Sequence, residues 1–138
     1  MTFLLDVDLL AACIWESHLR HDEANPWLAA QPEFFTCPAT EMGFLRVSLS
    51  PGYAVAYGEA RLALAAFCAV PTHRFLADHT TAAALPPLGS RHAISDAHLV
   101  TLARNCGLNL ATLDARRCRA PWADGIAVNP LGPAPAPP

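Results

Sequence analysis

Two aspartates in this sequence follow directly after short apolar runs, a position from which acids can act together. Asp6 ends the run Phe3-Leu4-Leu5, and Asp114 ends the run from Leu108 to Leu113. Continuous apolar runs of this kind are typical of strands buried on both faces in a parallel sheet. A carboxylate at the carboxyl end of such a strand lies on the sheet edge where open α/β folds bind ligands. The two aspartates are therefore candidates for one common site.

Two further acids fall near the starts of expected helices. Glu41 lies in or just after the first turn of a helix that Pro38 should open, and Asp96 lies in the first turn of a helix over 94–106 with Ser95 as its N-cap. Taken alone, each acid would be interpreted as a partner of the helix dipole. Because strand ends and the following helix starts share one edge of a parallel sheet, we expect Glu41 and Asp96 beside Asp6 and Asp114.

A cluster of four carboxylates calls for a positive charge. Two carboxylates about 4 Å apart repel by roughly 1 kcal/mol in water and about 4 kcal/mol at an effective dielectric near 20. Oxygen-only ligands favour Mg²⁺ or Mn²⁺ over zinc. Such a site activates a water molecule and stabilises the charge of a phosphoryl displacement. The pattern thus predicts metal-dependent hydrolysis of a phosphodiester.

The elements that must position these acids alternate along the chain. Apolar and turn patterns predict helices over 9–15, 21–30, 38–49, 54–70 and 94–106, and strands over 3–5, 34–37, 74–77, 108–113 and 125–128. Without hairpin signals between them, this order predicts an α/β fold, a three-layer α/β/α sandwich with a mostly parallel sheet. We expect one domain over 1–130 and a Pro/Ala-rich C-terminal tail over 131–138, extended or disordered. On the helix from Pro38, Met42, Leu45 and Leu49 should form the apolar face.

The composition limits the class of protein. The chain has 138 residues, of which 53% are hydrophobic and 15% charged, with a net charge of −3, so no global positive field draws it to nucleic acid or to anionic membranes. The five cysteines are odd in number and include no C-x-x-C pair, so we expect no disulfide framework. No signal-like or membrane-spanning apolar segment is evident, so we expect a soluble, cytoplasmic protein that keeps its thiols reduced.

Four short stretches together resemble a known family. They run from Leu5 to Leu10, from Thr40 to Arg46, from Ser95 to Leu99 and from Ala111 to Asp114. In this order and at these separations they resemble the PIN-domain nucleases, and specifically the VapC toxins of bacterial toxin–antitoxin pairs.

The resemblance implies an endoribonuclease that depends on Mg²⁺ or Mn²⁺ and cleaves tRNA, rRNA or mRNA. Its catalytic acids would be Asp6, Glu41, Asp96 and Asp114, of which Asp6, Asp96 and Asp114 would bind the metal, with Thr112 as a supporting hydrogen-bonding residue. It further implies a homodimer and a cognate VapB-type antitoxin. Three arginines are candidates for contacts with RNA phosphates: Arg46, Arg116 and Arg117.

Some assignments stay open at this stage. Asp8 either caps a helix or adds a metal ligand, and His98 should point away from Asp96. The Asp6-Val7-Asp8 motif also resembles the start of haloacid-dehalogenase-type phosphatases, but those enzymes use a lysine in the phosphate site and this chain has none. The remaining alternative is a PIN-like module without catalytic activity, whose acids only cap helices.

Overall fold

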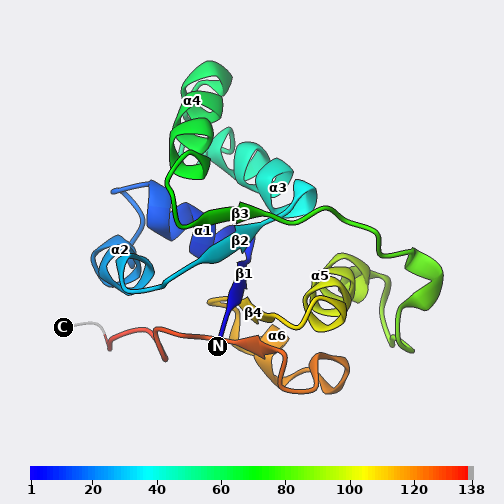
Figure 1. Ribbon diagram of the computed structural model, residues 1–138. Helices are drawn as coiled ribbons and strands as arrows, with labels where there is room; N and C mark the ends of the chain where they lie inside the picture. Colours follow the sequence, from blue (N-terminus) through cyan, green and yellow to red (C-terminus); the bar gives the residue numbers. More distant parts are fainter. Residues whose placement is uncertain (137–138) are drawn as a thin grey trace.

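A computed structural model describes residues 1–136 and shows a parallel five-stranded sheet (Figure 1). The strand order is β3-β2-β1-β4-β5, so that β1 lies at the centre. The strands are β1 (Phe3–Leu5), β2 (Phe34–Thr36), β3 (His73–Phe75), β4 (Asn109–Ala111) and β5 (Ala127–Val128). Each neighbouring pair is parallel, which confirms the α/β class predicted from the sequence.

Six α-helices connect these strands within the described residues. They are α1 (Val7–Ile14), α2 (His21–Ala29), α3 (Pro38–Ser48), α4 (Tyr57–Cys68), α5 (Ile94–Asn105) and α6 (Ala115–Arg119). Three short 3₁₀ turns complete the pattern: η1 (Ala82–Ala84), η2 (Arg91–Ala93) and η3 (Pro121–Ala123). No helix among residues 1–136 combines the length and apolarity needed to cross a membrane.

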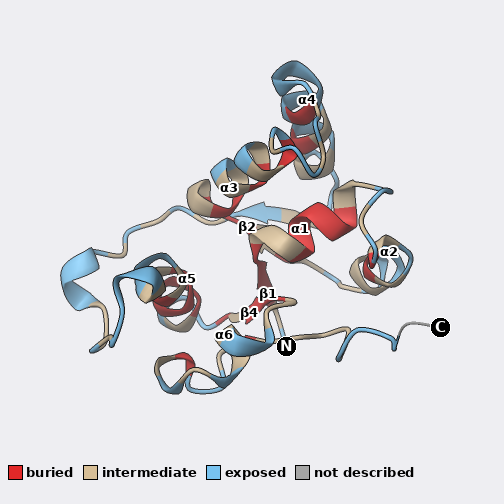
Figure 2. Cartoon of the chain, turned by 180° about the vertical axis from the view of Figure 1, so that it is seen from behind, coloured by how far each residue is buried: buried red, intermediate tan, exposed pale blue. Residues whose placement is uncertain are grey.

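The helices cover both faces of the sheet. Side chains alternate along a strand, so Phe3 and Leu5 of β1 pack on one face while Leu4 packs on the other. The first face is covered by α1 to α4 and the second by α5 and η3. Figure 2 shows buried residues concentrated on β1, α1 and the sheet-facing side of α5. The result is the three-layer sandwich expected from the alternation of strands and helices.

The contact between α1 and α3 is unusually close. Gly43 of α3 lies against Val7 of α1, and a Cβ atom at Gly43 would overlap Cγ2 of Val7. Glycine at this position therefore lets the two helices that follow β1 and β2 approach each other at the carboxyl edge of the sheet.

The buried face of α3 and the start of α5 differ from the sequence prediction. Met42 and Leu49 are 55% and 46% exposed, whereas α3 buries Thr40, Phe44 and Ser48. Ser95 is not the N-cap of α5, because the chain enters that helix through η2, which Ser90 caps by accepting a hydrogen bond from the backbone of His92. The predicted end of α5 is confirmed: Gly107 has a positive φ of 70°, a conformation that glycine adopts at little cost.

The start of the C-terminal segment contacts the body of the fold. Arg20, which is buried, donates hydrogen bonds to the carbonyl oxygens of Gly132 and Leu131 at 2.8 and 3.2 Å. Leu131 itself packs against the core. The last two residues of the expected tail, 137–138, lie outside the described residues. All five cysteines are free, as their number and spacing predicted.

Candidate active site

Asp6 occupies the carboxyl end of the central strand, where the chain turns into α1. Its backbone N–H donates to the carbonyl of Ala111 at the end of β4, which places the two strand ends side by side. Its Oδ1 accepts from the backbone of Val7 at 2.8 Å and so caps α1. The residue is only 2% exposed. A buried carboxylate is costly unless it is paired, so Asp6 needs a positive partner.

That partner in this structure is Arg117 of α6. Its Nη1 forms an ion pair with Oδ2 of Asp6, and its Nη2 donates to Oδ1 of Asp96 at 2.5 Å. The guanidinium therefore joins two of the acids predicted to bind metal. Burial lowers the pKa of Arg117, although the ordinary value is so high that the group stays charged.

Asp8 and Asp114 complete the group of aspartates. Asp8 accepts hydrogen bonds from the backbone N–H of Leu113 at 3.2 Å and from that of Leu9 at 2.6 Å. Burial raises the pKa of Asp8, and the negative charge of Asp114 adds to that effect. The pKa of Asp96 is also raised, by burial first and then by the charges of Asp114 and Asp8. The charge of Asp114 thus opposes the ionisation of both Asp8 and Asp96.

Thr112 links Asp8 to Asp114. Its hydroxyl is fully buried, donates to Asp8 Oδ2 at 3.4 Å and accepts from the backbone N–H of Asp114 at 3.1 Å. The Asp114 carboxylate accepts from the backbone of Arg116 and Arg117 and so caps α6. Thr112 therefore connects the two aspartates by hydrogen bonds, and its supporting role in catalysis stays a prediction.

A pocket of about 680 Å³ opens beside these aspartates. Asp6, Asp8 and Asp96 line it together with Arg117, while Asp114 does not belong to its wall. Residues of α3, including the exposed Arg46, and of the segment around η1 also line it. Arg116 is exposed and does not line the pocket, so of the two further arginines predicted to meet phosphate only Arg46 faces it.

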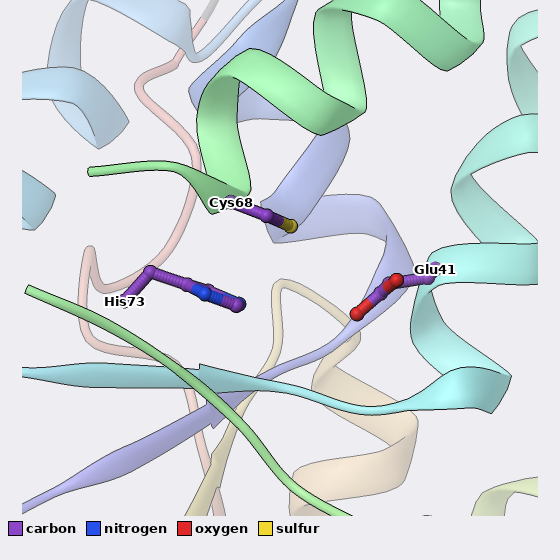
Figure 3. A group of neighbouring side chains, drawn as sticks. All are labelled: Glu41, Cys68 and His73. Carbon is purple, nitrogen blue, oxygen red and sulfur yellow. The ribbon is translucent and has the colours of Figure 1, made fainter. Parts of the chain in front are cut away.

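Glu41 is not brought into this group. Its side chain lies on the far side of α3 from the pocket lining, where Oε2 accepts from the hydroxyl of Thr36 at 2.8 Å. Its carboxylate, the thiol of Cys68 and the imidazole of His73 converge (Figure 3). The reason is helical periodicity, because Ala39, Met42, Gly43, Arg46 and Val47 present the pocket-facing stripe of α3. A catalytic role for Glu41 stays a prediction.

Two residues of the pocket were not chosen from the sequence. Tyr53 follows the break at Ser50-Pro51-Gly52, and its pKa is raised by burial and by the charge of Asp8. His98 lines the pocket, and its Nε2 contacts Asp78 at 2.8 Å rather than Asp96, from which it was predicted to point away. Neither position carries a sequence signal, because only the tertiary fold brings these side chains to the aspartates.

The aspartates fit a hard divalent ion in donor chemistry. All their ligand atoms are oxygens, and the buried Oδ2 of Asp6 receives no hydrogen bond from a described residue beyond its ion pair with Arg117. In the conformation described for residues 1–136, however, no three of these aspartates bring one carboxylate oxygen each within 4.8 Å of one another. The guanidinium of Arg117 holds the space between Asp6 and Asp96.

Comparison with known proteins decides the family. No protein-family model matches the chain. It is 42% identical over 119 residues to ribonuclease VapC38 of Mycobacterium tuberculosis, a match that covers 81% of this chain and 84% of the relative.

The chain belongs to the VapC ribonuclease family.

Further relatives and a solved structure agree with this assignment. Ribonucleases VapC29 and VapC39 of M. tuberculosis are 35% and 34% identical, over 87% and 90% of their own lengths. The crystal structure of VapC20 from the same species, described as a toxin that cleaves the sarcin–ricin loop, superposes with a TM-score of 0.65 at 16% identity over 86% of this chain and 95% of that one. The fold of this VapC chain is therefore that of a PIN domain. The phosphatase alternative is wrong, because the chain belongs to a family whose members are named ribonucleases.

Proposed function

We propose that this VapC protein is a metal-dependent endoribonuclease, the toxin of a toxin–antitoxin pair, and that the aspartate pocket is its active site. The observation that carries the proposal is the joining of Asp6 and Asp96 by one guanidinium at the carboxyl edge of β1 and β4. Two acids from elements far apart in sequence share a single positive charge there. In a family of ribonucleases, this is the position at which a divalent cation would serve the reaction.

The residues in and beside the pocket then have separate chemical tasks. Asp6, Asp96 and Asp114, with Asp8 as a further candidate, would hold Mg²⁺ or Mn²⁺. The bound ion supplies Lewis-acid polarisation of the phosphodiester and acidification of water. Thr112 keeps the carboxylate of Asp8 in place through its buried hydroxyl. Arg46, exposed on the pocket wall, is suited to contact an RNA phosphate and thereby fix the position of the strand.

The partners follow from the family. RNA is the proposed substrate, and with a net charge of −3 the protein must attract it through local arginines rather than through an overall field. We further propose a VapB-type antitoxin as the cognate partner and a homodimer as the assembled toxin. Inhibition by the antitoxin then requires that it blocks access to the aspartate pocket.

Incubation of the purified toxin with a mixed tRNA and rRNA pool tests the proposal. Discrete cleavage products are expected with Mg²⁺ or Mn²⁺, and none with EDTA or with Asp96→Ala. An Asp22→Ala variant, altered at an exposed acid of α2, should cleave as well as wild type. Intact RNA with folded, antitoxin-free wild-type protein and either metal would contradict the proposal and favour a PIN-like module without catalytic activity.

A further inference from the structure

A second group of metal-binding side chains lies outside the aspartate pocket. Glu41 comes from the first turns of α3, Cys68 is the last residue of α4, and His73 is the first residue of β3. Their ligand atoms all lie within 4.8 Å of one another. Figure 3 shows the three side chains directed toward a common space between these elements. Within the described part of the chain, no other three His, Cys, Asp or Glu side chains come so close.

The fold, rather than local sequence, produces this convergence. β2 and β3 pair in parallel with Phe34 opposite His73, and α3 packs on α4. The pairing brings the start of β3 to the sheet region covered by these helices. The three ligands thus come from separate segments, and one shared ion would tie the edge strand and the end of α4 to α3.

Thr36 lies between two of the three ligands. Its fully buried hydroxyl lies 2.8 Å from Glu41 Oε2 and 2.7 Å from His73 Nε2. One hydroxyl proton can serve only one of these acceptors at a time. The His73 ring also bonds the backbone carbonyl of Cys68, the kind of second partner that orients a metal-binding imidazole.

The charges of these three side chains favour the binding of a cation. Glu41 is half-buried and forms no ion pair with another of residues 1–136, and Arg74 of β3 pairs with Glu33. Burial and the charge of Glu41 raise the pKa of the Cys68 thiol, so thiolate formation needs a compensating positive charge. Burial lowers the pKa of His73, which favours the neutral imidazole that binds metals.

We propose that Glu41, Cys68 and His73 form a Zn²⁺ site that is separate from the aspartate pocket. Zinc is preferred because sulfur, imidazole nitrogen and carboxylate oxygen suit a borderline-soft ion, whereas Mg²⁺ prefers oxygen alone. A tetrahedral Zn²⁺ places such ligand atoms about 3.5 Å apart. Because the ligand atoms lie within 4.8 Å of one another, the side chains need to approach by no more than about 1.3 Å. Their partial exposure admits a water molecule as fourth ligand. Binding releases the thiol proton of Cys68 to solvent.

Titration of the metal-free, full-length protein with Co²⁺ and then with Zn²⁺ tests this site. Wild type should bind one Co²⁺ at this group and show near-ultraviolet thiolate-to-metal absorption. Zn²⁺ should displace the Co²⁺ and abolish this absorption, whereas excess Mg²⁺ should not. Cys68→Ser should abolish the absorption, and both Cys68→Ser and His73→Gln should weaken Zn²⁺ binding by about 100-fold. Zn²⁺ should raise the Tm of wild type by several degrees and that of the two variants by much less.

Two other cysteines supply the matched controls. Cys106→Ser changes an exposed thiol at the end of α5, and Cys118→Ser changes the thiol close to Asp114. Both variants should retain the absorption and the Zn²⁺ affinity of wild type. The proposal is overturned if wild type gives no thiolate absorption, if the signal disappears with Cys118→Ser instead, or if Cys68→Ser and His73→Gln bind Zn²⁺ as tightly as wild type. Circular dichroism of the metal-free variants shows whether each has folded.

Discussion

The guanidinium of Arg117 forms an ion pair with the buried carboxylate of Asp6 at the carboxyl end of the central strand. The same guanidinium reaches Asp96, so a positive charge of the chain itself pairs with two of the acids proposed to bind metal. It follows that Arg117 and a divalent cation compete for one place. Asp6 and Asp96 would hold a metal only when the Arg117 side chain turns away from them, and within the pocket that side chain could then meet an RNA phosphate.

Removal of Arg117 should therefore lower the stability of the metal-free protein and increase the stabilisation that Mg²⁺ provides. In EDTA, Arg117→Ala leaves the Asp6 carboxylate buried without its partner, and the free energy of unfolding should fall by about 3 kcal/mol. Mg²⁺ should restore more stability to this variant than it adds to wild type. Chemical denaturation with and without metal measures both effects. Arg116→Ala, at an exposed position of the same helix, should change stability by less than about 0.5 kcal/mol. Equal behaviour of the two variants in EDTA would contradict the pairing.

The pH dependence of stability follows from the raised pKa values of Asp8 and Asp96. Each carboxyl holds its proton more tightly in the folded chain than in the unfolded chain, where its pKa is near 3.8. In EDTA, the contribution of these two groups to the free energy of unfolding should therefore fall as the pH rises above about 3.8 and through their raised pKa values. Denaturation midpoints of wild type and of Asp8→Asn measure this contribution. The variant should lose less stability than wild type over that range, and identical slopes would argue against a buried, charged Asp8.

Metal should reverse the trend, because Mg²⁺ binds the deprotonated carboxylates. The rise in Tm caused by Mg²⁺ should grow with pH through the raised pKa values of Asp8 and Asp96 and then level off. Thermal unfolding at several pH values, each with Mg²⁺ and with EDTA, measures the difference. A metal-induced shift that does not change with pH would mean that the ion binds elsewhere.

The close contact of Gly43 with Val7 gives a prediction about the pocket wall. Gly43→Ala places a methyl group on Cγ2 of Val7, so α3 must move away from α1 and stability should fall by about 1–3 kcal/mol. RNA cleavage should fall as well, because both helices line the pocket. Gly58→Ala is the matched control: its Cβ meets no atom within 4 Å in α4, and the change should stabilise the helix by about 0.5–1 kcal/mol. Destabilisation by both substitutions alike would show that the helix contact is not the cause.

The sequence was a good guide where a short-range signal exists. The apolar run before Asp6 predicted β1, and the apolar run before Asp114 predicted the position of β4, because buried parallel strands leave a distinct pattern. The joining of Asp6 to the end of β4 then follows from strand pairing alone. The helix stop at Gly107 was equally clear, since a left-handed residue after a helix favours glycine.

Long-range packing decided what the sequence could not. The position of Glu41 after β2 was predicted, but the rotation of α3 that turns its carboxylate to Thr36 depends on how Phe44 and Ser48 pack. The apolar side chain of Met42 faces the pocket for the same reason. Arg117 was chosen as a phosphate contact, and its ion pair with Asp6 could not be inferred because α6 carries several arginines of equal appearance.

The rate of RNA cleavage by Asp6→Asn in the presence of Mg²⁺ or Mn²⁺ tests most directly whether the aspartate pocket is the active site. Asparagine keeps the capping position at the start of α1 but removes the buried charge, so the variant should fold. Because metal-ion catalysis supplies several kcal/mol of charge stabilisation, we expect the cleavage rate to fall on the order of a thousandfold. A folded Asp6→Asn variant that cleaves RNA at the rate of wild type would contradict the assignment of the aspartate pocket as the active site.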